Sequence, residues 1–264
     1  MYDYHLHTAF SADSDADPDD IINAAIHKGL EEIALTDHYD PMYRDPDFPF
    51  ELDFTGYTEM LGRVTAQYKD EITIKKGIEL GMQPGAPNRI CAETAAAFPF
   101  DFIIGSVHCA RGVSLDTPDY LAPRTPEQAV TDYYDDMLAA ITDFTDFDVL
   151  GHINYVERYI ERIPDETVYM NRIEQILKKL IELGKGIEIN TSSYRYGLKD
   201  TTPTMPILKL YKKLGGEIVT TGSDAHKAAD VGDHLEAAGH MLREAGIDYI
   251  ATYKNRKPTL HKLK

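Results

Sequence analysis

The chain has 264 residues, 43% of them hydrophobic, which is enough to fill a substantial core and is a usual length for a single α/β barrel. Its formal net charge of -17 disfavours nucleic acid and acidic lipid surfaces as partners, although a small anionic substrate stays open because bound cations reverse the local sign. The sequence has no apolar run long enough to cross a membrane, no N-terminal signal and no CxxC pair, so we expect a cytoplasmic protein without a disulfide framework.

The N-terminal segment predicts a strand followed by a helix. The run YDYHLH is strand-like and carries His5 and His7 at its end. After a polar loop, Asp17 suits a helix N-cap, Pro18 suits the first turn and Gly29 suits the stop. We therefore expect a helix between Asp17 and Gly29 that leads into the next strand.

Four further apolar runs follow, separated by segments with helical character. Helices are expected near 55–70, 88–97 and 126–142. Each run is typical of a buried strand and stops at or next to a histidine or glutamate, in the order EIALTDH with His38, EITIKKGIE with Glu79, FDFIIGSVH with His108 and FDVLGH with His152.

The last third of the chain repeats this alternation. Apolar residues at helical spacing predict a helix over 166–183, which precedes the strand GKGIEINTS. The segment TMPILKLYKKLGG is expected to be a helix closed by glycines, and EIVTTGSDAH a strand that ends at Asp224 and His226. A helix over 228–245 and the segment DYIATY, a last strand or closing segment, complete the pattern. Seven strand–helix units predict a parallel sheet covered by helices, one unit fewer than a standard eight-stranded barrel.

Histidines are concentrated at the ends of the predicted strands. Six of the ten histidines occur there, whereas independent placement would scatter them over helices and loops. Parallel barrel strands deliver their C-terminal ends to one face, so the pattern predicts metal-type ligands gathered on that face. Residues i and i+2 of a strand point to the same side, which makes His5 and His7 a candidate ligand pair; the alternative is a hydrogen-bonded strand surface. A buried carboxylate such as Glu79 is costly unless it is paired or metal-bound.

An ordered set of motifs supports this interpretation, namely HLHT, TDH, GIE, GSVH, GH and GSDAH. In this order they resemble the polymerase and histidinol phosphatase (PHP) family of metal-dependent phosphoesterases, and in particular its histidinol-phosphate phosphatase branch. The resemblance extends from residue 2 to about 258. It implies an α/β fold, a distorted (β/α)7 TIM-like barrel, which agrees with the strand count, and a single phosphoesterase domain over residues 1–264.

The resemblance also implies three divalent metal ions, for which zinc, iron and manganese all fit the nitrogen and oxygen ligands. The first metal would be held by His5, His7, Glu79 and Asp224, and the second by Glu79, His108 and His152. The third would take His38, His226 and Asp13, at a position where several relatives have a histidine. Because a carboxylate is a harder ligand than an imidazole, the metal preferred by the third site is left open.

Two arginines match positions that this branch uses to bind phosphate, a group that suits the planar guanidinium fork. They are Arg158, which follows His152 in GHINYVERY, and Arg195, just beyond the strand GIEINTS. For Arg158 the alternative is a salt bridge with Glu157 or Glu161.

The implied reaction is hydrolysis of L-histidinol phosphate to L-histidinol and phosphate, a step of histidine biosynthesis. A metal-bound hydroxide would attack phosphorus, and Asp224 would orient it or relay a proton. The acid that protonates the leaving group would be a metal-bound water, with His234 as a second candidate. The alternatives are a phosphoesterase for another small phosphomonoester or a nucleotide, and a non-catalytic metal-binding module. The oligomeric state is left open.

Two long loops, 39–54 and 109–125, follow the strand-end residues His38 and His108. Such loops either form the walls of a site or pack over the barrel rim. A substrate with an imidazole and an amino group needs aromatic or carboxylate contacts. The loops offer candidates for these contacts that the sequence leaves unassigned, namely Tyr43, Phe48, Phe50, Asp116 and Tyr120.

Overall fold

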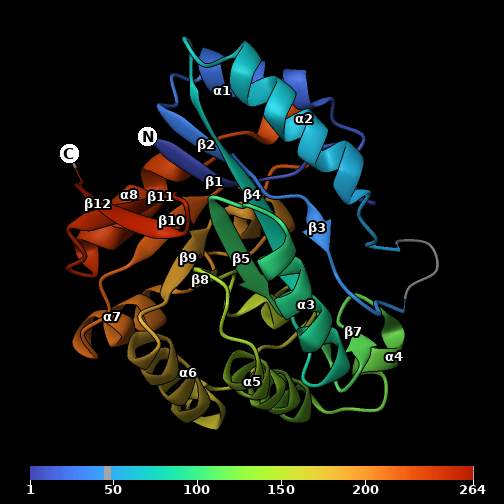
Figure 1. Cartoon of the computed structure of the whole chain (residues 1–264). Helices are drawn as coiled ribbons and strands as arrows, with labels where there is room; N and C mark the ends of the chain where they lie inside the picture. The colour runs from blue at the N-terminus through green and yellow to red at the C-terminus, as the bar shows by residue number, and fades with distance from the viewer. Residues whose placement is uncertain (45–48, 264) are drawn as a thin grey trace.

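Parallel strands form a nearly closed barrel with helices around it in the computed structural model, which describes residues 1–44 and 49–263 (Figure 1). The strands follow one another around the barrel as β1 (Tyr2–Leu6), β2 (Glu32–Leu35), β4 (Thr73–Gly81), β5 (Phe102–Ser106), β8 (Val149–Leu150), β9 (Gly186–Asn190) and β10 (Val219–Gly222). A short strand, β3 (His38–Tyr39), pairs with the C-terminal half of β4. The predicted distorted (β/α)7 TIM-like barrel is thereby confirmed.

The first and last barrel strands are joined beyond the end of β10. The His7 N–H donates to the Ala225 carbonyl at 2.9 Å, and the Asp224 N–H donates to the His5 carbonyl at 2.8 Å. These hydrogen bonds place His5 and His7 next to Asp224 and His226.

The helices lie outside the barrel and end much as the sequence predicts. They are α1 (Pro18–His27), α2 (Phe54–Gln67), α3 (Ala86–Ala97), α5 (Pro126–Asp143), α6 (Met170–Glu182), α7 (Met205–Lys213) and α8 (Leu235–Glu244), with a short α4 (Pro118–Leu121) in a loop. Asp17 caps α1 by accepting the Asp19 N–H, and Gly29 follows the helix at φ +69°, a conformation that glycine adopts at little cost. Among the described residues, no helix combines the length and hydrophobicity needed to cross a membrane.

Two predicted helices start too early. The segment 228–245 contains only a 3₁₀ turn, Ala228–Asp230, before α8, because Gly232 and His234 adopt positive φ and interrupt the helix. Within 166–183, α6 begins only at Met170; Glu166–Val168 forms a separate 3₁₀ turn capped by the side chain of Asp165.

The segment DYIATY is not a barrel strand. It forms β11 (Tyr249–Lys254), which pairs antiparallel with β12 (Lys257–Lys262), a mostly exposed strand that the sequence analysis missed. The hairpin covers the N-terminal end of the barrel, where Arg256 Nε donates to Asp148 Oδ2 at 2.6 Å and the Tyr253 N–H donates to the Tyr4 hydroxyl at 2.8 Å. A buried cluster fills this end, made of Tyr4, Ala34, Phe102, Ile104, Val149, Ala251 and Tyr253. Burial of one such aromatic side chain contributes about 2 kcal/mol to the stability of the folded protein. The apolar cluster therefore stabilises the N-terminal end of the barrel.

Candidate metal centre

The predicted ligands come together at the C-terminal end of the barrel strands. They come from the ends of several strands and from the loops that follow them, and all but Asp13 and His226 are largely buried. The ligands are His5, His7, Asp13, His38, Glu79, His108, His152, Asp224 and His226. The topology explains this, because parallel strands expose one common end.

Glu79 lies at the centre of this cluster and is fully buried. Its Oε2 lies 3.0 Å from His5 Nε2, 3.5 Å from His7 Nε2 and 3.0 Å from His38 Nδ1, while its Oε1 lies 3.1 Å from His152 Nε2 and 3.3 Å from His108 Nε2. The two oxygens of one carboxylate thus face two separate groups of imidazoles, an arrangement that suits a ligand shared between two cations.

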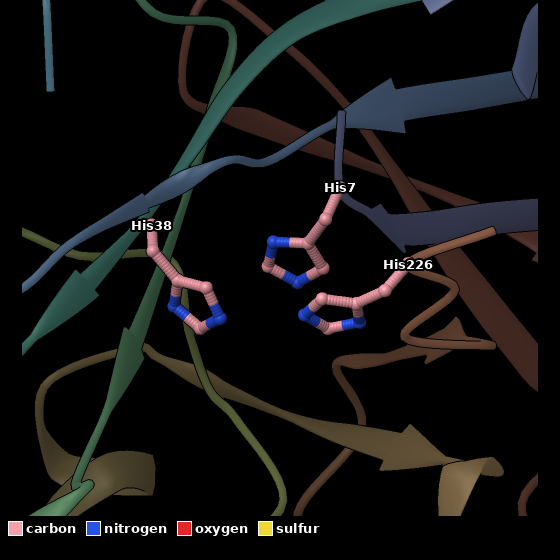
Figure 2. A group of neighbouring side chains, drawn as sticks. All are labelled: His7, His38 and His226. Carbon is pink, nitrogen blue, oxygen red and sulfur yellow. The ribbon is translucent and has the colours of Figure 1, made fainter. Parts of the chain in front are cut away.

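Three imidazoles gather in a triangle beside Glu79. The ring centroid of His7 lies 4.3 Å from that of His38 and 4.1 Å from that of His226, and the last two lie 5.8 Å apart (Figure 2). Asp13 closes this group, with its Oδ2 3.1 Å from His226 Nε2 and 3.8 Å from His38 Nε2. Burial would raise the pKa of Asp13, but the charges of His38 and His226 outweigh it and lower that pKa.

Several buried nitrogen atoms of this cluster form no well-aligned hydrogen bond among the described residues, namely His7 Nε2, His38 Nδ1, His152 Nδ1 and His226 Nε2, although carboxylate oxygens lie 3.0 Å from His38 Nδ1 and 3.1 Å from His226 Nε2. Buried polar atoms of this kind are costly unless something satisfies them. Within the described residues, four groups have ligand atoms close enough to hold an ion: His7, His38 and His226; His5, His7 and Asp224; His38, Asp40 and His108; Glu79, His108 and His152. Imidazole nitrogens and carboxylate oxygens therefore fit divalent transition-metal ions here.

The pKa values of Glu79 and His7 favour metal ligation by these two residues. Burial would raise the pKa of Glu79, but the charges of His5, His38 and His108 lower it well below its usual range. The pKa of His7 falls well below its usual range because of burial and the charges of His226 and His38. An ionised carboxylate and a neutral imidazole are the forms that bind a metal. Burial would lower the pKa of His5 and His108, but the neighbouring charges of Glu188 and Asp40 raise it well above its usual range, so these two imidazoles would release a proton when a metal binds.

Two supporting carboxylates were missed by the sequence analysis. Glu188 of β9 is buried, with Oε1 2.6 Å from His5 Nδ1 and Oε2 accepting the His152 N–H at 3.0 Å. Asp40 Oδ2 lies 2.6 Å from His108 Nδ1. The sequence did contain a signal for Glu188. A charged residue inside the buried run GIEIN, on the one strand without a predicted ligand, could have been predicted to pair with another polar group.

Arg158 lies at the edge of the cluster. Its guanidinium is stacked against Tyr155 and Tyr196, 4.4 and 3.7 Å from the two ring centroids, and Nη2 donates to Ser192 Oγ at 2.8 Å. Nη2 is also 4.0 Å from Asp224 Oδ2. The side chain lines the cavity beside the predicted metal ligands.

The alternative for Arg158, a salt bridge with Glu157 or Glu161, is not formed among the described residues. Glu157 instead accepts hydrogen bonds from Asn154 Nδ2 at 2.8 Å and from the Tyr169 hydroxyl at 3.3 Å.

Arg195 holds the turn that carries Asp224. Its Nη2 donates to the carbonyls of Ser223 at 2.6 Å and Asp224 at 2.8 Å, while its buried Nη1 has no hydrogen-bond partner among the described residues. Asp224 has φ +53°, which is uncommon for a residue other than glycine, so the surrounding contacts must hold this turn. Arg195 is not among the residues lining the cavity, and neither is the exposed His234.

A cavity of about 170 Å³ opens onto the cluster. Both long loops contribute to its wall, through Tyr43 and Phe50 and through Ser114 and Asp116. Tyr120 is instead buried, with its hydroxyl donating to the Ala129 carbonyl at 2.6 Å. Phe48, the remaining candidate on these loops, lies outside the described residues.

Comparison with known proteins identifies the family. The PHP domain model matches residues 3–192. A histidinol-phosphatase of Lactococcus lactis is 32% identical, over 97% of this chain and 95% of that protein. A probable histidinol-phosphatase of Clostridium acetobutylicum is 30% identical, over 94% of each. The crystal structure of histidinol phosphate phosphatase from Lactococcus lactis, complexed with zinc, L-histidinol and phosphate, superposes with a TM-score of 0.87, at 30% identity and with 98% of each chain covered. The chain therefore belongs to the PHP domain family, in its histidinol-phosphatase branch.

Proposed function

We propose that the protein hydrolyses the phosphomonoester L-histidinol phosphate to L-histidinol and phosphate, and that residues 1–264 act as one phosphoesterase domain. The observation that carries this proposal is the position of Glu79, whose two carboxylate oxygens face five histidines within 3.5 Å. A relative of similar length has been crystallised with zinc, L-histidinol and phosphate, which supports the same substrate here.

The ligand set supports three divalent ions, of zinc, iron or manganese. We propose that the first is held by His5, His7, Glu79 and Asp224, the second by Glu79, His108 and His152, and the third by Asp13, His38 and His226. When bound, such ions supply a water of lowered pKa and offset the negative charge of a phosphate.

The protein's own groups would bind the phosphate and orient the reaction. Arg158 is held by two tyrosine rings, so its guanidinium is ordered before substrate arrives. Arg195 Nη2 fixes the turn that carries Asp224, and Nη1 lies 3.8 Å from Asp233 Oδ2; the predicted part of Arg195 in phosphate binding therefore rests on its position next to Asp224. Asp224 Oδ2 accepts from Ser192 Oγ at 3.0 Å, and in this position the carboxylate would orient the attacking water or take up its proton.

This function implies a place in histidine biosynthesis, and we propose that the protein acts in the cytoplasm on a small molecule rather than on nucleic acid. Both cysteines, Cys91 and Cys109, are buried and free, which supports a reducing compartment. The net charge of -17 supports the absence of a polymeric nucleic acid substrate.

Steady-state kinetics with a panel of phosphomonoesters tests the proposal. We expect kcat/KM to be highest for L-histidinol phosphate and lower for nucleoside monophosphates and sugar phosphates, and we expect a chelator to abolish all activity. A flat profile across the panel, or a preference for nucleotides, would overturn the substrate assignment. Chelator-resistant hydrolysis would overturn the metal-dependent mechanism.

A further inference from the structure

The cavity beside the metal-ligand cluster has one carboxylate that the proposed mechanism does not use. Three aspartates line the cavity, Asp13, Asp116 and Asp224. Asp13 contacts His226 at 3.1 Å and Asp224 contacts His7 at 3.3 Å, so both belong to the ligand cluster. Within the described part of the chain, Asp116 forms no ion pair with any lysine, arginine or histidine.

Asp116 is held in place through one of its oxygens. The hydroxyls of Ser114 and Tyr43 both donate to Oδ1, the latter at 3.4 Å, and these two hydroxyls also contact each other. Over residues 1–44 and 49–263, no donor reaches Oδ2. The carboxylate is therefore oriented while one oxygen stays available to a ligand in the cavity.

Aromatic rings line the same cavity as this carboxylate. Tyr43 and Phe50 meet edge to face, with ring centroids 4.8 Å apart, and Phe50 lies 4.7 Å from the ring of His38. Tyr155 and Tyr159, whose hydroxyls are joined by a hydrogen bond of 2.6 Å, line the same cavity. Aromatic faces with one carboxylate form a site that suits an organic cation.

The charge distribution of the substrate matches the two ends of the cavity. L-histidinol phosphate is anionic at the phosphate and carries an ammonium group near the imidazole. If the phosphate binds beside Arg158 and the metal ligands, the ammonium group must be matched elsewhere on the cavity wall. We infer that Asp116 recognises the ammonium group of the substrate and thereby sets the preference for amino-alkyl phosphomonoesters. This inference rests on the proposed function.

The experiment compares wild type with Asp116→Asn on two esters that share the imidazole and the phosphate, L-histidinol phosphate and the imidazolylpropyl phosphate that lacks the amino group. With the metal-loaded protein, we expect kcat/KM for L-histidinol phosphate to fall about tenfold or more. The value for the ester without an amino group should change less than about threefold, because that ester has no charge to lose. Calorimetry with L-histidinol should show a matching loss of affinity.

Asp119→Asn is the matched control. Asp119 is an exposed carboxylate on the short helix α4, three residues after Asp116, and it does not line the cavity. It should leave both values unchanged. An equal loss on both imidazole esters in Asp116→Asn would overturn the inference, since the missing interaction would then not be with the amino group. Nitrophenyl phosphate, a phosphomonoester without imidazole or amino group, tests the proposed function separately. If the wild-type protein shows no preference for L-histidinol phosphate over nitrophenyl phosphate, the proposed function is wrong and this inference with it. Because that result needs only the wild-type protein, it can be distinguished from a failure of the inference about Asp116.

Discussion

His5 Nδ1 lies 2.6 Å from Oε1 of Glu188, and both side chains are buried. The other nitrogen of the same ring, Nε2, lies 3.0 Å from Glu79 Oε2. A carboxylate on one ring nitrogen fixes the tautomer and the orientation of an imidazole, and it raises the basicity of the opposite nitrogen. Glu188 therefore orients the ring of His5 for the metal-ligand role that we propose for this histidine.

Replacement Glu188→Gln should weaken metal binding. The amide keeps the shape of the side chain but removes the charge that supports the ring, and loss of such a partner typically costs about 10- to 100-fold in metal affinity or activity. Metal content after exhaustive dialysis, together with kcat/KM, measures the effect. Glu217→Gln, at an exposed position, is the control and should retain its metal. If Glu188→Gln keeps full metal content and full activity, Glu188 does not support the ligand.

Metal removal should destabilise the protein as well as inactivate it. Without cations, buried imidazole nitrogens such as His7 Nε2 and His226 Nε2 have carboxylate oxygens nearby but form no well-aligned hydrogen bond, which is costly. We expect chelation to lower Tm, and zinc or manganese to restore both Tm and hydrolysis. Elemental analysis of the restored protein should give three ions per chain. An unchanged Tm after verified metal removal would contradict this account.

Much of the site follows from the sequence because its residues interrupt apolar runs. His38 and His152 stand at the ends of buried strands, and parallel strands carry such residues to one face. Glu188 is different, since it lies inside a run in which both strand faces are buried, so its orientation depends on neighbouring strands. The strand β12 was missed because its exposed, polar residues lack the alternation that marks a half-buried strand. The predicted helix start at 228 was wrong because the Gly232 N–H donates to Asp3 Oδ2 instead of joining a helix. Asp3 lies at the other end of the sequence, so the local pattern could not reveal this hydrogen bond.

Asp13 should control the third metal position. Its Oδ2 lies 3.1 Å from His226 Nε2 and 3.8 Å from His38 Nε2. We expect Asp13→Ala to reduce the metal content by one ion per chain. Asp13→His should keep that ion but shift its preference from manganese towards zinc, because imidazole is the softer ligand. Elemental analysis after competition with equal concentrations of both metals provides the measurement. Equal metal contents in all three proteins would rule out Asp13 as a ligand.

Arg158→Ala should lower kcat by about 100-fold or more, as expected when a donor that stabilises transition-state charge is removed. Metal content should stay at the wild-type level, since Arg158 contacts mainly Ser192 and two tyrosine rings, and Asp224, the proposed metal ligand with which it pairs, lies 4.0 Å away. Arg172→Ala, which removes a peripheral ion pair with Asp135 on α5, is the matched control. Should Arg158→Ala retain full catalytic efficiency, the phosphate must be bound by other groups.

Arg195→Ala should combine a catalytic loss with a local structural one. Its Nη2 holds the carbonyls of Ser223 and Asp224, so the turn that presents Asp224 loses two charge-assisted hydrogen bonds. We expect kcat to fall and amide hydrogen exchange in this turn to accelerate, whereas Arg158→Ala should leave exchange there unchanged. Normal turnover combined with unchanged exchange would show that Arg195 has neither role.

Asp19 provides a pH-dependent contribution to stability far from the metal cluster. Its carboxylate accepts from Arg63 Nη2 at 2.8 Å and from the Tyr68 hydroxyl at 2.7 Å, which ties α1 to α2. The hydrogen bond from Arg63 is the main reason that the pKa of Asp19 is lowered. A carboxyl with a lowered pKa stabilises the folded state above its unfolded pKa, and this contribution is lost as the pH falls through the folded value.

Because the Asp19–Arg63 pair is partly exposed, we expect Asp19→Asn to lose only about 1 kcal/mol of unfolding free energy at pH 7, or about 2–4 °C in Tm. The difference in Tm from wild type should shrink as the pH falls below about 4, where the unfolded carboxyl becomes protonated. Taking this difference cancels the titration of the metal ligands, which both proteins share, and Asp70→Asn serves as an exposed control. A difference that stays constant from pH 7 to about 3 would show that the effect of the substitution is not electrostatic.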